Sequence, residues 1–397
     1  MISEKSTIHL KNSAYAAGYE ILCLSINIFG SILIARTVGP MRFADYAIVS
    51  TSVATYCILL RGYQPAIASA VALSNLDRKQ PISGNNMQFA ITILVLISGW
   101  VISIKFLATF SQVSQVFYLY GTALIPAHAL TIFISGVLQG LNNVQRWRLH
   151  VVIATTSQLP FLIIGAKWHL ELPYFILILT IPSVAYLYIS SKYINSSHAA
   201  INLLRPKINL KSSLLALLAA SIAGTPLFFA KQLSGNQGLG QTVYFLSGLI
   251  VASNLGAMFG SFLLTDRITS HFSGVINRML IHVLHSIPCL VYGVTFALSG
   301  HWILGRLIGP DYSNSIPKEF ILLATIATSI WSINFSVFEE FLLSMKNSII
   351  FSLLLILGAE TTLLIFTEID YISFFILHLS MGLVVVLLNK KFLYQEK

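Results

Sequence analysis

Long apolar stretches alternate with short polar ones along the whole chain, and this pattern predicts its architecture. A helix needs about 20 mostly apolar residues to cross a lipid bilayer. Twelve such stretches can be marked, at 14–35, 43–64, 89–110, 116–138, 149–166, 172–190, 213–231, 241–264, 279–299, 319–343, 348–367 and 371–389. The pattern therefore predicts an all-α polytopic membrane protein with about twelve transmembrane helices.

Composition agrees with this architecture. Hydrophobic residues make up 56% of the 397 residues and charged residues only 10%, with a mean hydropathy of +0.79. A soluble domain is usually about a quarter charged. The polar segments are no longer than about 25 residues, which leaves no room for a soluble catalytic domain. There is no Gly-x-x-x-x-Gly-Lys loop and no His-Glu-x-x-His pair, so we expect no enzyme. A membrane polysaccharide polymerase, the enzymatic alternative, would be expected to carry a long outer loop.

The distribution of Lys and Arg predicts the orientation, because cytoplasmic loops are enriched in both. With the N-terminus inside, sixteen of the 24 basic residues fall on the cytoplasmic side and seven at the outer side, while Arg61 lies within the second helix. Both termini are therefore predicted to be cytoplasmic. Much of the net charge of +10 follows from this topology and does not imply nucleic-acid binding. The three cysteines fall inside helices at no metal-ligand spacing, and no cofactor is expected.

The longest basic inner segment, 191–212, divides the chain into two sets of six helices. We expect an N-terminal lobe at 1–190 and a C-terminal lobe at 213–397, with 191–212 as a cytoplasmic linker. The second half echoes the first, because Arg36 before a glycine-containing turn compares with Lys231 before another, at an offset of 195 residues. Duplicated halves with the binding site at their interface are common in transporters. The chain is thus predicted to form two pseudo-symmetric lobes around a central cavity.

Basic residues lie beside and inside the first predicted helix pair. Gly39-Pro40 suits a tight reversal, because glycine permits positive φ and proline fixes its own φ. Arg36 precedes this turn, and Arg61 lies in the second helix about 24 Å beyond Asp45, where we place the start of the hydrocarbon, at 1.5 Å per residue. Charge within a membrane is costly and is a functional hypothesis by default. Arg36 either lines a cavity or extends to the outer interface, and Arg61 lies either low in the cavity or at the inner head groups.

Two acidic residues are candidates for ion coupling. Glu360 lies about 18 Å along the eleventh predicted helix, close to the bilayer midplane. A carboxylate at that depth needs a proton, a cation or water, so Glu360 either couples transport to an ion or is a structural partner for Arg61. Asp45 is the second candidate, although it could instead cap the second helix or pair with Arg42.

Several polar or helix-breaking residues fall inside the predicted helices. Asn27, Asn254 and Asn334 lie near mid-depth, where they either bond sugar hydroxyls or tie helices together. Prolines interrupt the fifth, sixth, seventh and ninth predicted helices, at Pro160, Pro182, Pro226 and Pro288. Such breaks suit a transporter that bends its helices, although static bundles contain them too.

Three segments resemble, in the same order, motifs of a known family. They are Ala35-Arg36-Thr37-Val38-Gly39-Pro40 with Phe43 and Tyr46-Ala47, then Gly136-Val137-Leu138-Gln139-Gly140-Leu141-Asn142, and the predicted outer loop Leu307-Ile308-Gly309-Pro310-Asp311-Tyr312. The family is that of the Wzx-type polysaccharide flippases, of the multidrug/oligosaccharidyl-lipid/polysaccharide exporter superfamily. Val38 and Ala44 depart from the family pattern, which has Leu and Gly there.

The resemblance implies alternating access between two six-helix lobes in the bacterial inner membrane. The implied substrate is an undecaprenyl-pyrophosphate-linked oligosaccharide repeat unit, moved outward for a surface polysaccharide such as the O-antigen of lipopolysaccharide, a capsule or an exopolysaccharide. An ion gradient, of protons or sodium, would drive the movement, and a polysaccharide polymerase is a possible partner. A diphosphate cannot cross hydrocarbon without replacement of its hydration. Basic side chains offer that replacement, and the candidates for substrate binding are Arg36, Arg61, Arg146, Lys231 and Arg267.

Two other transporters remain as alternatives. A multidrug or cation antiporter of the same superfamily would favour cationic drugs and acidic cavity residues, whereas the intramembrane charge here is mostly basic. A lipid-II-type flippase would differ only in its substrate.

Overall fold

The computed structural model describes most of the chain, in nine segments. They are residues 4–62, 86–140, 144–197, 210–234, 238–270, 283–312, 316–340, 347–367 and 369–393. Helices account for nearly all of these residues, and the described segments contain no β-strand. The chain divides into two compact units, Met1–Leu217 and Leu218–Lys397, which we call unit 1 and unit 2. Each is described by itself.

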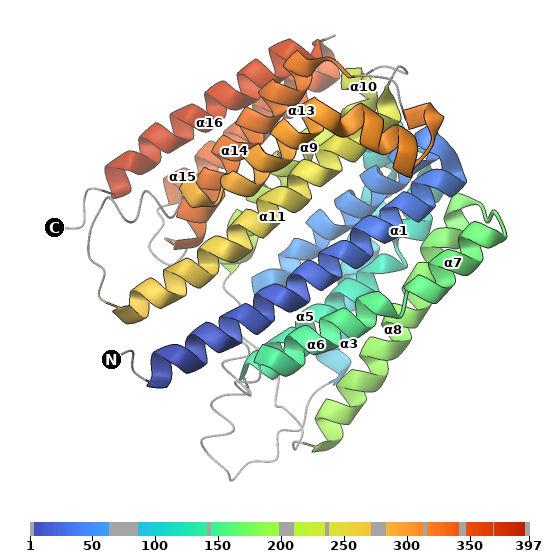
Figure 1. The fold of residues 1–397 in the computed structure, drawn as a ribbon, viewed down its shortest axis with the longest axis vertical. Coiled ribbons are helices and arrows are strands. Elements are labelled where there is room, and N and C mark those ends of the chain that lie inside the picture. Colours follow the sequence, from blue (N-terminus) through green and yellow to red (C-terminus); the bar gives the residue numbers. More distant parts are fainter. Residues whose placement is uncertain are drawn as a thin grey trace. The chain divides into compact units, whose positions relative to one another are not determined.

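Unit 1 holds the helices of the first half. They are α1 (Glu4–Cys57), the 3₁₀ turn η1 (Ile58–Gly62), α3 (Asn86–Ser111), α4 (Gln115–Gly121), α5 (Leu124–Gly140), α6 (Val144–Thr156), α7 (Leu159–Lys167) and α8 (Leu172–Ser197). Helix α9 (Leu210–Phe228) crosses the boundary between the units. The helices of unit 1 appear in blue to green in Figure 1.

Unit 2 holds the remaining helices, drawn in yellow to red in Figure 1. They are α10 (Ala230–Ser234), α11 (Leu239–Ser270), α13 (Ile287–Leu307), the 3₁₀ turn η2 (Pro310–Tyr312), α14 (Lys318–Glu340), α15 (Asn347–Phe366) and α16 (Tyr371–Leu393). Among them α14 packs closely against α16, and α11, α13 and α14 contact one another.

The predicted all-α polytopic architecture is confirmed. Five described stretches are long and apolar enough to cross a membrane, at Ile21–Leu60, Ile91–Ser111, Gln115–Gly136, Ser213–Ser234 and Ile287–Leu307. Shorter apolar helices follow at Val151–Lys167, Leu172–Pro182, Ile350–Phe366 and Tyr371–Leu387. Many large apolar side chains on these helices are exposed, among them Ile102, Leu298 and Phe366 at 81%, 76% and 78%. Side chains of this kind on the outside of a bundle are suited to lipid contact.

The reversal expected at Gly39-Pro40 is present. Gly39 has φ 76° and ψ 172°, which interrupts α1 and divides it into two arms. In Figure 1 the two blue arms of α1 meet at this turn. Unit 2 has a similar feature before α11, where Gly238 has φ 71°. Both backbone angles lie in the left-handed region, which glycine adopts without the clash of a Cβ.

The proline positions are confirmed in part. Pro160 and Pro226 lie at interruptions, because α6 and α7 are separate helices and α9 ends two residues beyond Pro226. The predicted span 279–299 ends too early, since α13 runs from Ile287 to Leu307, and α13 is preceded by helical residues 283–284 and a turn at 285–286. Pro288 therefore lies in the first turn of a helix, where its missing N–H has no helical partner to lose. Leu307, the first residue of the predicted outer loop, is therefore the last residue of a helix.

Candidate functional site

Two side chains of α14 hold α16 close by donating to its backbone. Trp331 donates from Nε1 to the carbonyl oxygen of His378 over 3.1 Å, and Asn334 donates from Nδ2 to that of Gly382 over 2.9 Å. Gly382 permits the approach, because a Cβ there would lie 3.0 Å from Cγ2 of Ile330 and 3.3 Å from Nε1 of Trp331. Asn334 thus ties two helices together, which was one of the two roles predicted for it.

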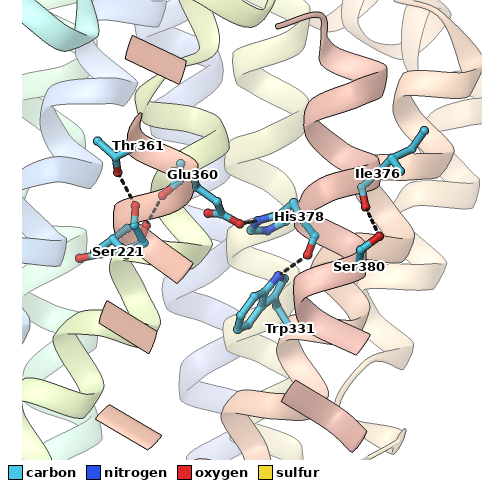
Figure 2. Close-up of polar contacts among 9 residues, drawn as sticks. Ser221, Trp331, Glu360, Thr361, Ile376, His378 and Ser380 are labelled. Atoms are coloured by element: carbon cyan, nitrogen blue, oxygen red, sulfur yellow. Dashed lines mark hydrogen bonds and ion pairs between the residues drawn. The ribbon is translucent and has the colours of Figure 1, made fainter. Parts of the chain in front are cut away.

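A buried ionisable pair connects α15 to this assembly. Oε1 of Glu360 lies 2.6 Å from Nδ1 of His378, and the two side chains are 0% and 2% exposed. Figure 2 shows the carboxylate of Glu360 pointing from α15 toward the imidazole on α16. The hydroxyls of Thr361 and Ser380 nearby each donate to a carbonyl of their own helix, over 2.7 Å. The pair is thus a side-chain link between two helices, whereas these hydroxyls serve only their own helix.

Aromatic rings enclose the imidazole of His378. The ring of Phe374 stacks on it with centroids 5.6 Å apart, and the rings of Trp331 and Phe375 lie 5.5 Å and 6.3 Å away. These surroundings exclude water from His378. The second carboxylate oxygen of Glu360, Oε2, is also buried, and among the described residues it has no hydrogen-bond partner.

This arrangement can hold a proton within an apolar region. A carboxylic acid can donate to an imidazole nitrogen, and a carboxylate can accept from an imidazole N–H, so the 2.6 Å contact suits either placement of the proton. Because the two groups interact directly, their protons belong to the pair and not to one residue.

The two basic residues predicted to be equivalent occupy similar local positions in their units. Arg36 lies in α1, three residues before Gly39, and its side chain is exposed. Lys231 lies in α10, seven residues before Gly238, and is half-buried. Each therefore lies near the end of a helix that a glycine of positive φ follows. Their predicted role in binding a substrate stays a prediction.

The other predicted site residues are placed with less detail. Arg61 lies in η1, Arg146 in α6 and Arg267 in α11, but their side chains lie outside the described part of the structure. Asp45 is half-buried on α1, with a fully shielded Oδ1, and it interacts electrostatically with Tyr118. The partner of Glu360 in the described structure is His378, which sequence reasoning did not single out.

A second polar cluster, within unit 1, surrounds Trp100. Its indole Nε1 donates to the carbonyl oxygen of Tyr118 over 3.2 Å. The Tyr118 hydroxyl lies 2.9 Å from Oγ of Ser111, and the Tyr56 hydroxyl donates to the carbonyl of Leu96 over 2.9 Å. The three aromatic rings pack in series, with centroids 5.3 Å and 5.9 Å apart. We call these residues the Trp100 cluster.

Comparison with known proteins identifies the fold. No protein-family model matches the chain, and no curated protein sequence matches it. Several solved structures match the chain. An inward-facing multidrug resistance MATE family transporter of the MOP superfamily matches with a TM-score of 0.59 and 15% identity, over 94% of this chain and 98% of that one. The outward-facing form matches with a TM-score of 0.52 and 12% identity over 97% and 95%. A MATE structure in a straight conformation gives 0.53 and 13% over 97% and 96%. The protein therefore has the fold of MATE transporters.

Proposed function

We propose that this protein is a secondary transporter that works by alternating access and uses an ion gradient. The observation that carries the proposal is the likeness to both inward-facing and outward-facing MATE transporters over nearly the whole length of each chain. Glu360 is the proposed coupling residue, because it is a carboxylate buried in an apolar helix of a membrane protein. We expect no enzymatic step in this cycle.

As the substrate we propose a lipid-linked oligosaccharide, carried across the bacterial inner membrane for surface polysaccharide synthesis. The motifs around Gly39 and Gly309 and the basic residues Arg36 and Lys231 support this choice. An Arg guanidinium and a Lys ammonium are suited to a diphosphate head group. Its sugars would remain in water, while the prenyl chain would stay in lipid.

The second candidate is a multidrug antiporter, and likeness to solved structures favours it over the flippase, because those structures are of MATE transporters. The charges of the described residues favour the flippase. An organic cation needs an acidic partner in the membrane, and the one fully buried acid of the described residues, Glu360, is already paired with His378.

Deletion of the gene distinguishes the two candidates. In the native bacterium, under conditional repression of repeat-unit synthesis, surface polysaccharide is resolved on a gel. If the protein is a flippase, the polymer ladder is lost and lipid-linked repeat units accumulate at the cytoplasmic face. An intact ladder with increased sensitivity to cationic dyes would identify the antiporter.

Complementation of that strain then tests the basic residues. Arg36→Glu and Lys231→Glu should each fail to restore the ladder, because each replaces attraction for a diphosphate by repulsion. Lys105→Glu is the matched control, since Lys105 is an exposed residue of α3 with no proposed contact to substrate. Restoration by both charge reversals, at normal protein levels, would contradict the roles of Arg36 and Lys231.

A further inference from the structure

The pair formed by Glu360 and His378 points to the identity of the coupling ion. We infer that this ion is a proton and that Glu360 and His378 hold it together, so that His378 is a second coupling residue. This inference rests on the proposed ion-coupled transport and adds the ion and the partner residue. Its basis is the 2.6 Å contact between two buried ionisable side chains from different helices.

Charge balance favours one bound proton. With Glu360 ionised and His378 neutral, the pair carries one negative charge in an apolar region, which is costly without water. One added proton makes the pair neutral overall, either as a carboxylic acid with an imidazole or as a carboxylate with an imidazolium. Uptake forms one O–H or N–H bond, and release returns the proton to water and leaves the carboxylate. No other co-reactant is needed.

The other described ionisable side chains on the helices around the pair do not neutralise its negative charge. Among the described side chains of α9, α15 and α16 the only acidic, basic or histidine residues in the apolar spans are Glu360 and His378 themselves. On α14, Lys318 and Glu319 are exposed in the first turn, about 20 Å from Trp331 at 1.5 Å per residue. The charge of the pair therefore depends on its own protons.

The ligands suit a proton better than a metal cation. Hard cations such as sodium are held by several oxygen atoms, whereas imidazole nitrogen suits transition metals. At Glu360 one oxygen faces a nitrogen, and the hydroxyls of Thr361 and Ser380 are bonded to their own helices. The described residues contain no cluster of three or more His, Cys, Asp or Glu side chains that could hold a metal ion. Oε2 of Glu360 does not face His378, and it has no hydrogen-bond partner among the described residues.

Ion-jump measurements on the whole purified protein test this inference. Proteoliposomes adsorbed on a solid-supported membrane are exposed to a pH jump at constant sodium, or to a sodium jump at constant pH, without any transported substrate. The expected result is a transient charge displacement after the pH jump and none after the sodium jump. A displacement driven by sodium at constant pH would overturn the proton assignment.

Variants locate the response. Glu360→Gln and His378→Asn should each reduce the pH-driven displacement at least tenfold, and the double variant should behave like either single one, because the proton belongs to the pair. Glu319→Gln and His301→Asn, which alter exposed residues of the same types on α14 and α13, should retain it. If Glu360→Gln retained the pH-driven displacement, Glu360 would not be the proton site. If His378→Asn retained it, the proton would not be shared with His378. A normal amount of folded protein in the detergent extract is required of every variant compared.

The outcome is separable from that of the proposed function. Because the jump measurement contains no substrate, a displacement that depends on the pair supports proton binding even if the polysaccharide ladder survives deletion of the gene. Conversely, a lost ladder with no pH-driven displacement would leave a transporter whose coupling site is not this pair, which overturns the inference alone.

Discussion

The Trp100 cluster in unit 1 and the Glu360–His378 site in unit 2 are built on the same contact. In each, a buried tryptophan donates from Nε1 to a backbone carbonyl on another helix, over 3.2 Å at Trp100 and 3.1 Å at Trp331. In each, aromatic rings pack around the indole. The bond satisfies a donor that burial would otherwise leave without water, and it holds two helices in register.

The two sites differ in the polar groups placed beside the indole. In the Trp100 cluster they are the hydroxyls of Tyr56, Tyr118 and Ser111, which keep their protons near neutral pH. Beside Trp331 they are the carboxyl group of Glu360 and the imidazole of His378, which together can hold a proton. The same tryptophan contact thus lies beside hydroxyl groups in unit 1 and beside a pair of ionisable side chains in unit 2. Asp45 interacts electrostatically with Tyr118 of the Trp100 cluster.

Removal of the imidazole should have the largest effect on stability. His378→Ala leaves the Glu360 carboxylate buried without a partner, and loss of one member of a buried pair costs about 3–5 kcal/mol. Thermal unfolding in detergent at pH 8 measures the change. His301→Ala, at an exposed position of α13, should change stability by less than about 0.5 kcal/mol. Equal melting of both variants would contradict the importance of the pair.

A methyl group between α14 and α16 should have the next largest effect. Gly382→Ala places a Cβ 3.0 Å from Ile330 and should destabilise the protein by about 1–3 kcal/mol, as overpacking does. At Gly358 of α15 nothing lies within 4 Å of the added Cβ, so Gly358→Ala should stabilise by about 0.5–1 kcal/mol through helix propensity. Thermal unfolding of the two variants should therefore shift in opposite directions, and a shared direction would contradict this description of the helix contact.

Removal of a hydroxyl from the Trp100 cluster should have a smaller effect. Tyr118→Phe loses the neutral hydrogen bonds of its hydroxyl with Ser111 and Ser52, and should cost about 0.5–1.5 kcal/mol for each. Because no proton is exchanged near neutral pH, the cost should be the same at pH 6 and pH 8, in contrast to His378→Ala. Parallel unfolding measurements at the two pH values check this. If the loss of stability in Tyr118→Phe depended on pH, the proposed difference in pH response between the Trp100 cluster and the Glu360–His378 site would be wrong.

The smallest expected effect is at the start of α16. Asp370 is exposed and accepts a hydrogen bond from the backbone N–H of Ser373 over 2.9 Å. Hydrogen bonds from Ser373 lower the pKa of Asp370. A lowered pKa in the folded state means that the stabilisation is present at neutral pH and is lost as the pH falls through the folded-state value. Asp370→Ala should lower the unfolding temperature slightly at pH 7 and leave it unchanged near pH 3. An equal shift at both pH values would exclude this explanation.

Sequence reasoning identified the helices well, because an apolar stretch of about 20 residues has few alternatives in a membrane protein. It also located Glu360, since an acid in the middle of such a stretch needs an explanation. The turn at Gly39-Pro40 followed from the backbone preferences of the two residues. The end of α13 was wrong by eight residues, because Ser299-Gly300-His301 was read as the end of the apolar stretch, whereas the helix continues to Leu307.

The partner of Glu360 could not be identified in this way. His378 lies 18 residues further on, in another helix, and the sequence does not give the rotation of either helix about its axis. The signal that could have suggested it is a lone histidine in an apolar span that follows one with a lone acid. The role of Trp331 depends on the close approach of α14 to α16. That approach is possible because Gly382 has no side chain, and the spacing of apolar residues along the sequence does not indicate it.

The most direct test of the account is hydrogen–deuterium exchange of α15 compared with α3 of unit 1, at pH 6 and pH 8. If Glu360 and His378 hold the coupling proton, its loss leaves a buried negative charge that only water can solvate, so water must enter beside α15. After correction for the intrinsic pH dependence of exchange, peptides spanning Glu360 should exchange several-fold faster at pH 8 than at pH 6, and those of α3 should not change. Glu360→Gln should exchange slowly at both pH values. Identical exchange of wild-type α15 at the two pH values, or the same acceleration in Glu360→Gln, would contradict the claim that this pair holds an exchangeable proton.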